Sequence, residues 1–248
     1  MATRLPTKSA PPRARINHIN RFSPRNMCPL WQWDARPQPT LHLVAEPEIY
    51  GAQERSKIRN TSPMGFHHVA IAIHDAKANF EFYTNVMGFE LVKTVTGPTP
   101  DGGWSKHFFY STGTSESGEQ GMIAFWEIHD ESIGRDFGTN LNKSANLPWW
   151  VNHLAFDAPT MADFERHRER WRSHGYVVLE VDHDFCRSIY IRDPEGNTVE
   201  FCHTVREFTS EEKQHAYELL MDAQPPLEKQ FGATVWQPEG EPISVGGQ

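Results

Sequence analysis

The stretch His68-Val69-Ala70-Ile71 returns later in the chain as His153-Leu154-Ala155-Phe156. Each copy follows a polar residue and leads into a helix-like stretch that ends in glycine. A duplicated stretch of this kind predicts a protein built from two equivalent halves. Because a histidine opens both copies, we expect a metal ion between the halves, with Glu200 completing its ligand set.

The first copy opens a β-α-β-β-β pattern. Val69, Ile71 and Ile73 alternate with smaller residues, which predicts a strand over 66–73. Asp75 is a favourable helix N-cap, and Gly88 suits the left-handed residue that ends a helix. Three further strands are predicted at 89–95, 106–111 and 122–128.

The second copy repeats this order after a linker over 129–150 that is rich in Asn and Gly. A strand at 151–156 precedes a helix between Thr160 and Gly175, and strands follow at 176–181, 187–192 and 198–204. The last two are separated by a strong turn signal, Asp193-Pro194-Glu195-Gly196-Asn197. The predicted fold class is therefore α+β, with two β-α-β-β-β modules forming a cupped mixed sheet around a metal site.

The predicted domains follow from these patterns. Residues 1–63 hold ten basic and four acidic residues without sustained periodicity, which predicts a disordered, basic and proline-rich extension, or alternatively a transit peptide. The paired domain spans 64–204, with modules at about 65–128 and 151–204. In 205–248, a capping-box pattern from Thr209 to Glu212 predicts a terminal helix through Met221, followed by a loose tail from about Gln237.

Composition narrows the function classes. The chain has 248 residues, 38% of them hydrophobic and 23% charged, so a packed core is expected. A net charge of −8 argues against a nucleic-acid binder, and no apolar run is long enough to cross a membrane. Three scattered cysteines suit a reducing, cytoplasmic setting. An acidic domain with an amphipathic terminal helix is compatible with a homo-oligomer.

The candidate metal ligands are His68, His153 and Glu200. If the halves pack with pseudo-twofold symmetry, the histidines of equivalent strands converge and Glu200 faces the same space. Two imidazoles and one carboxylate leave the opposite coordination positions open, which suits non-haem Fe(II) with room for substrate and O₂. A single histidine is more often a surface or core residue, and it is the recurrence that favours ligation here.

The paired modules, the two histidines and the ending Asp193-Pro194-Glu195-Gly196-Asn197-Thr198-Val199-Glu200 resemble the vicinal oxygen chelate superfamily. That superfamily includes glyoxalase I, type I extradiol ring-cleavage dioxygenases, fosfomycin-modifying enzymes and bleomycin-resistance proteins. The resemblance covers about residues 65–204 and does not choose among these reactions. It implies a small-molecule substrate that binds through vicinal oxygens.

A narrower resemblance points to the extradiol dioxygenases. His183 lies seven residues before Tyr190, which lies ten residues before Glu200, and this spacing is similar in the catechol and dihydroxybiphenyl enzymes. It implies that His183 hydrogen-bonds substrate or oxygen and that Tyr190 hydrogen-bonds a substrate oxygen. We therefore expect an Fe(II)-dependent dioxygenase in aromatic compound catabolism that opens a small catecholic or related ring with O₂.

Two alternatives remain open. Glyoxalase I uses a fourth ligand, a glutamate in the last strand of the first module, where Glu127 is the only acid; spacing places the ligand position nearer Ala124 or Phe125. With Glu127 as a fourth ligand, the set of two histidines and two glutamates would suit zinc, nickel or cobalt, whereas iron or manganese would suit the dioxygenase. The other alternative is a metal-free binding or resistance protein.

Aromatic residues near the candidate site would suit a flat substrate. The candidates to line its cavity are Trp104, Phe108, Trp126, Trp149 and Trp150. Ordinary core or interface packing is at least as common a role for each of them.

Overall fold

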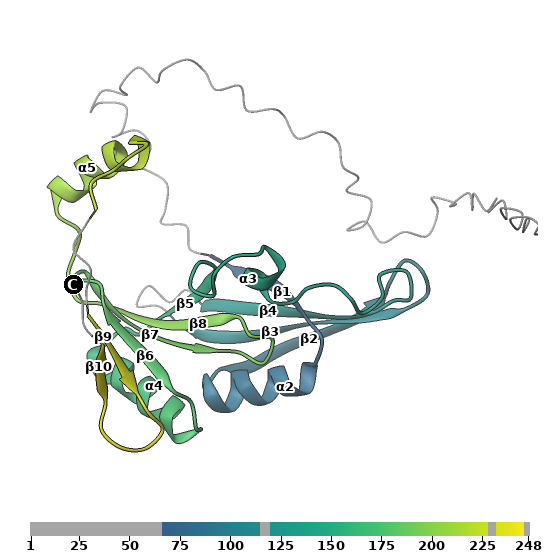
Figure 1. Ribbon diagram of the computed structural model, residues 1–248. Helices are drawn as coiled ribbons and strands as arrows, with labels where there is room; N and C mark the ends of the chain where they lie inside the picture. Colours follow the sequence, from purple (N-terminus) through teal and green to yellow (C-terminus); the bar gives the residue numbers. More distant parts are fainter. Residues whose placement is uncertain (1–65, 115–119, 228–231, 246–248) are drawn as a thin grey trace, which may run out of the picture. The chain divides into compact units, whose positions relative to one another are not determined.

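The computed structural model describes residues 66–114, 120–227 and 232–245, and the predicted extension 1–63 lies outside them. The described residues form two β-α-β-β-β repeats and a C-terminal segment (Figure 1). The first repeat contains β1 (His68–Ile73), α2 (Ala76–Glu81), the π-helical turn η3 (Phe82–Val86), β2 (Glu90–Pro98), β3 (Trp104–Thr114) and β4 (Gln120–His129). The second contains β5 (His153–Asp157), α4 (Met161–Ser173), β6 (Val178–Asp182), β7 (Cys186–Arg192) and β8 (Thr198–Thr204). The short helix α3 (Leu141–Ser144) lies in the linker between them.

Each repeat forms its own mixed sheet, which confirms the α+β class and the duplicated pattern. The strand order is β1-β4-β3-β2 in the first sheet and β10-β9-β6-β7-β8-β5 in the second. In both repeats the first strand pairs in parallel with the last, and the other pairings are antiparallel. Among the described residues no strand of one sheet pairs with a strand of the other.

The predicted helix signals are confirmed. Asp75 Oδ1 accepts hydrogen bonds from the amides of Lys77 and Ala78, and Gly88 ends this helical segment at φ 82°. Thr160 begins α4 with a capping box. The last turn of the first helix is wider than predicted, since the Met87 amide bonds the Phe82 carbonyl at 3.0 Å in π-helical geometry.

The core joins the two repeats. Phe89 packs against Phe156 with ring centroids 4.9 Å apart, and the Tyr83 hydroxyl donates to Asp193 Oδ2 at 3.2 Å. The predicted turn at 193–197 forms, and its Glu195 accepts a hydrogen bond from the His74 amide at 2.8 Å. The turn therefore closes the β7–β8 hairpin and ties the second repeat to the first.

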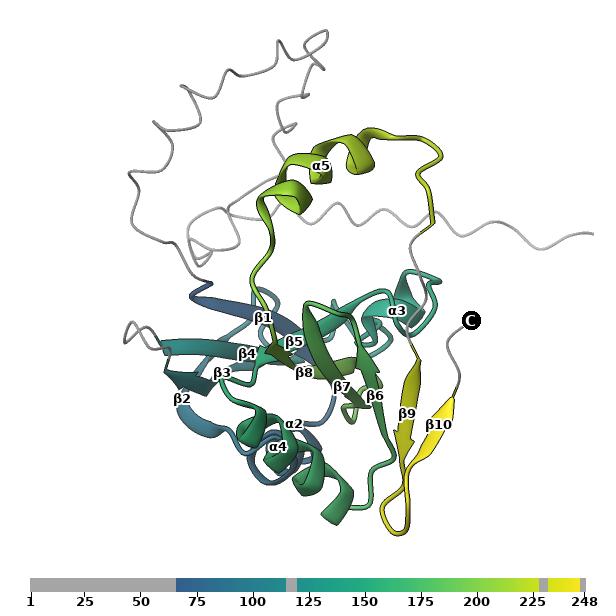
Figure 2. The same cartoon turned by 90° about the vertical axis from the view of Figure 1, so that its left-hand side faces the viewer.

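The C-terminal segment differs from the prediction in one respect. The terminal helix α5 (Ser210–Met221) forms behind a capping box at Thr209, and none of its residues is buried. β9 (Ala233–Trp236) and β10 (Ile243–Val245) form a hairpin that extends the second sheet beside β6 (Figure 2). The loose tail predicted from about Gln237 is therefore wrong at Ile243–Val245. In the described residues no helix is long and apolar enough to cross a membrane.

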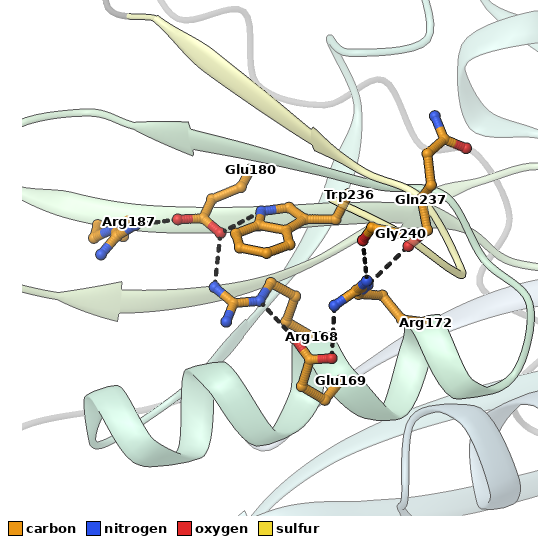
Figure 3. A network of polar contacts seen from close by, with 8 residues as sticks. All are labelled: Arg168, Glu169, Arg172, Glu180, Arg187, Trp236, Gln237 and Gly240. Atoms are coloured by element: carbon orange, nitrogen blue, oxygen red, sulfur yellow. Dashed lines mark hydrogen bonds and ion pairs between the residues drawn. The ribbon is translucent and has the colours of Figure 1, made fainter. Parts of the chain in front are cut away.

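Residues distant in sequence hold this hairpin in place (Figure 3). The Trp236 indole donates to Glu180 Oε2 at 2.8 Å, and the Arg168 guanidinium lies 4.0 Å from the Trp236 ring centroid. Arg172 donates to the carbonyls of Gln237 and Gly240. Cation–π and charge-assisted contacts of this kind order a segment whose own sequence has no strong strand signal.

Candidate functional site

His153 and Glu200 lie together on one face of the second sheet. The β5–β8 register pairs Ala155 with Glu200, so His153, two residues earlier, shares that face. His153 Nε2 and Glu200 Oε2 are 3.2 Å apart, within ion-pair distance. Glu200 is 4% exposed, and its Oε2 has no aligned hydrogen-bond partner among the described residues. A buried carboxylate oxygen in this situation has unused capacity to bind a cation.

Tyr190 and His183 lie next to this pair. Tyr190 of β7 is directly opposite Glu200 in the β7–β8 register, and its ring centroid is 6.3 Å from that of His153. The Tyr190 hydroxyl and His183 Nε2 are 3.1 Å apart and share one hydrogen bond. Burial raises the pKa of Tyr190, and the neighbouring Glu200 carboxylate raises it further, so the phenol is neutral at pH 7. The predicted catalytic pair therefore lies beside two of the three predicted ligands.

We call the face that carries His153, Tyr190 and Glu200 the site face. His68, the third predicted ligand, lies in the first sheet at the start of β1. Its Nδ1 is 2.8 Å from that of His67, and its ring lies 5.4 Å from the ring of Phe109. In the part of the chain that is described, no three His, Cys, Asp or Glu side chains are grouped closely enough to hold a metal. Within one copy, the structure thus brings together His153 and Glu200 but not His68.

Glu127 has other partners. Lys106 Nζ lies 2.8 Å from one of its carboxylate oxygens, and His129 Nε2 lies 3.3 Å from the other. Burial alone would raise the pKa of Glu127, but the hydrogen bonds from Lys106 and His129 outweigh it and lower the pKa. The β1–β4 register pairs Ala70 with Ala124, as Ala155 pairs with Glu200, so Ala124 occupies the equivalent ligand position.

A cavity of about 400 Å³ lies beside Tyr190. Of the five predicted aromatic lining residues, Trp149 borders it, while Phe108 is in the core. Trp104 stacks on His129 and Trp126 on His107, and Trp150 is 62% exposed. The other lining residues are Tyr176, Val177, Leu179, Tyr190, Ile191, Arg192 and Val235.

Sequence reasoning predicted only Trp149 and Tyr190 among the lining residues and missed the other six. Of these six, Arg192 and Val235 differ in how they could have been found. Arg192 follows Tyr190 by two residues in a predicted strand, so the period of two already placed it on the same face. Val235 belongs to β9, where Thr234, Val235 and Trp236 all favour strands, so this short run just before the predicted tail was the available signal.

Comparisons with known proteins identify the family of this chain. Residues 65–201 match a family model described as "Glyoxalase/Bleomycin resistance protein/Dioxygenase superfamily". A comparison with curated proteins finds no significant match.

Similar solved structures cover little more than half of the chain. A glyoxylase/bleomycin resistance protein/dioxygenase domain from Frankia sp. EAN1pec is 18% identical (TM-score 0.39), covering 58% of this chain and 99% of its own. Lactoylglutathione lyase from Agrobacterium tumefaciens is 23% identical (TM-score 0.39), covering 58% and 96%. A fosfomycin resistance protein from Listeria monocytogenes is 18% identical (TM-score 0.35), covering 61% and 99%.

The family model spans more than half of the chain, and it includes both repeats and all five predicted site residues. The chain therefore belongs to the glyoxalase/bleomycin resistance protein/dioxygenase superfamily, the vicinal oxygen chelate proteins.

Proposed function

We propose that this protein is a metal-dependent extradiol-type dioxygenase that opens a small catecholic or related aromatic ring with O₂. The observation that carries the proposal is the juxtaposition of two pairs on the site face: His153 with Glu200, and His183 with Tyr190. The first pair has the donor atoms of a metal site, and the second has the groups that general acid–base chemistry requires.

The residues present fit a divalent metal, and Fe(II) is the ion we favour. The buried Glu200 oxygen without an aligned partner lies 3.2 Å from His153 Nε2, which supports the proposal that these two side chains are ligands. With His68 as the third ligand, they would form the set of two histidines and one carboxylate that is typical of non-haem iron oxygenases. When bound, such a metal would supply Lewis-acid and redox chemistry to a substrate with vicinal oxygens.

Tyr190 and His183 would manage the protons. A neutral Tyr190 hydroxyl can donate a hydrogen bond to a substrate oxygen and stabilise its negative charge as the ring opens. The Tyr190 hydroxyl has one proton, which it donates either to the substrate oxygen or to His183 Nε2, 3.1 Å away. In the second arrangement a substrate hydroxyl can pass its proton to Tyr190 as Tyr190 passes its own to His183, and the proton can return by the same path.

We further propose that a second copy of the chain supplies His68. β1 and β5 are both edge strands of their sheets, and both carry an exposed histidine. Exposed edges of this kind are favourable sites for association, and a twofold axis would place two such contacts in one dimer.

Co-expression of two variants tests this arrangement. Chains carrying His68→Ala and Glu200→Gln, with different tags, would form a heterodimer in which one site has all three ligands. We expect metal in this heterodimer and none in either parent homodimer. If His68 acts within its own chain, no metal is recovered in the heterodimer.

Of the two alternative functions, the glyoxalase-like lyase has less support than the metal-free binding protein. A glyoxalase-like lyase needs a carboxylate in the first repeat, but the equivalent position is Ala124 and Glu127 is paired with Lys106 and His129. The separation of His68 from the other ligands favours a metal-free binding protein as the second candidate.

Metal analysis followed by an activity assay distinguishes these functions. The protein is purified without oxygen, its metal content is measured, and the iron-reconstituted form is assayed for O₂ uptake with a panel of catechols. We expect near-stoichiometric iron and ring-cleavage products, with both lost in His153→Ala. Uptake of no metal, combined with tight ligand binding, would instead establish the binding protein.

A further inference from the structure

The cavity beside Tyr190 is apolar apart from one cation. Among the residues that line it, Arg192 is the only one with a formal charge, and the others are aromatic or aliphatic. The Arg192 guanidinium lies 5.6 Å from the centroid of the Trp149 ring at the edge of this space. A cavity of this composition suits a flat apolar molecule that carries one anionic group.

Arg192 differs from Arg187 of the same strand and from Arg168 of α4, because it has no carboxylate partner among the described residues. Arg168 and Arg187 both bind Glu180, which is buried on the opposite face of β6 (Figure 3). Among the described residues no Asp or Glu forms an ion pair with Arg192. Its planar guanidinium is therefore available for a carboxylate of a ligand, which it can bind through two parallel hydrogen bonds.

The position of Arg192 relative to Tyr190 indicates where the anionic group lies. The two residues are separated by two positions on β7, so their Cα atoms are about 7 Å apart on the same face. This spacing is close to the length of a substituted benzene ring. A ligand with its vicinal oxygens near Tyr190 would place a carboxylate on the far side of the ring near Arg192.

The C-terminal hairpin provides another wall of the cavity. Val235 is opposite Leu179 in the β6–β9 register, and Leu179 is opposite Tyr190 in the β6–β7 register. The hairpin lies outside the segment that matches the family model, and Trp236 anchors it to Glu180. The cavity therefore combines the repeat common to the family with a segment added to it.

From these contacts we infer that the substrate is an aromatic carboxylate, with Arg192 binding its carboxylate and Val235 limiting the size of its ring system. The placement of the vicinal oxygens near Tyr190 rests on the proposed function. The preference for a carboxylate depends only on Arg192 and the cavity. Carboxylate binding can therefore be measured without metal and without turnover.

Calorimetric titration of the full chain, without added metal, tests the inference with 2-naphthoate and its neutral isostere 2-naphthamide. We expect naphthoate to bind wild type at least about tenfold more tightly than naphthamide, because only the carboxylate can pair with Arg192. Arg192→Gln should remove this preference, and Arg192→Lys should keep part of it, since a lysine retains the charge but not the paired hydrogen bonds. Val235→Trp should weaken both probes.

The matched control is Arg166→Gln, which removes the same charge from an exposed position on α4 outside the cavity. It should leave both affinities within about twofold of wild type. Equal binding of the two probes, an unchanged preference in Arg192→Gln, or no binding of either probe would overturn the inference. Inorganic phosphate binding as tightly as naphthoate would also overturn it, because the site would then recognise an anion without its ring.

The outcomes separate this inference from the proposed function. If wild type binds naphthoate selectively but takes up no metal, the dioxygenase proposal fails and the cavity selectivity stands. If the protein binds iron and consumes O₂ with catechols but does not prefer naphthoate, the inference about Arg192 fails alone.

Discussion

The two repeats have the same strand pairing but different side chains at equivalent positions. Glu200 and Tyr190 of the second repeat correspond by register to Ala124 and Phe109 of the first. In the first repeat the carboxylate is replaced by a methyl group and the phenol by an unsubstituted ring. The comparison indicates that a duplicated backbone has kept its geometry while the proposed chemistry is concentrated in one half, and His68 is what the first half adds.

The helices of the two repeats differ in a similar way. His167 stacks on Phe201 with ring centroids 3.6 Å apart. Phe125 corresponds to Phe201 by register, and the ring that packs on it is Tyr83, with centroids 4.6 Å apart. The second repeat therefore has a histidine, which titrates in the mildly acidic range, where the first has a tyrosine.

The largest effect on metal binding and activity is expected when the carboxylate of the second repeat, which the first repeat lacks, is removed. Glu200→Gln should reduce metal affinity by more than about a hundredfold and abolish activity, since losing even an outer-shell partner of a ligand costs about ten- to a hundredfold. Metal content by elemental analysis checks this, with Glu127→Gln as the matched control. Full metal content in Glu200→Gln would remove Glu200 from the ligand set.

Tyr190→Phe would give the second repeat the residue that the first has at Phe109. We expect the rate of ring cleavage to fall by about a hundredfold with metal content unchanged, because only the hydroxyl is lost. The rate is measured by single-turnover kinetics. Tyr110→Phe is the control, since the Tyr110 hydroxyl bonds Asn79 in the core and its loss should affect stability alone. A Tyr190→Phe variant with the wild-type rate would show that the phenol takes no part.

The pH dependence of stability sharpens the comparison of the helices. Burial, together with the nearby charges of Arg166 and Arg170, lowers the pKa of His167 to about 4. The unfolded chain therefore binds a proton at His167 more readily than the folded chain does. The contribution of this residue to the free energy of unfolding is complete above about pH 6.5 and is lost as the pH falls toward 4. We expect a loss of about 2 kcal/mol in the free energy of unfolding, after allowing for partial exposure.

Urea unfolding at pH 7.5 and pH 5 measures this effect. His167→Phe, which keeps an aromatic ring but removes the titrating group, should reduce the difference in unfolding free energy between the two pH values. A pH dependence that is the same in this variant and in wild type would assign the effect to other groups.

The smallest effect is expected for Glu127→Gln in the first repeat. The ion pairs of Glu127 with Lys106 and His129 are partly exposed, so their loss should cost about 0.5 kcal/mol or less in the free energy of unfolding. Activity and metal content should stay at the wild-type level. A variant without metal would instead support a glyoxalase-like site that includes Glu127.

Local signals in the sequence were sufficient for much of the fold. The N-caps at Asp75, Thr160 and Thr209 are all observed, and Gly88 and Gly175 have the positive φ angles that were expected. These signals depend on contacts between residues only a few positions apart, so the residue types at those positions are enough to predict them. The C-terminal hairpin was missed because its stabilising contacts join Trp236 to residues far away in the chain, Arg168 and Glu180.

The sequence by itself determined the duplication, the family resemblance and the identity of the candidate ligands, because a repeated motif and its turn residues are visible as spacing. Only the tertiary structure decided which candidates meet: His153 with Glu200, and His183 with Tyr190, but not His68 with either pair. It also placed Arg192 and Val235 around one cavity. Strand register and the packing of distant segments control these encounters, and both depend on contacts over the whole chain rather than on neighbouring residues.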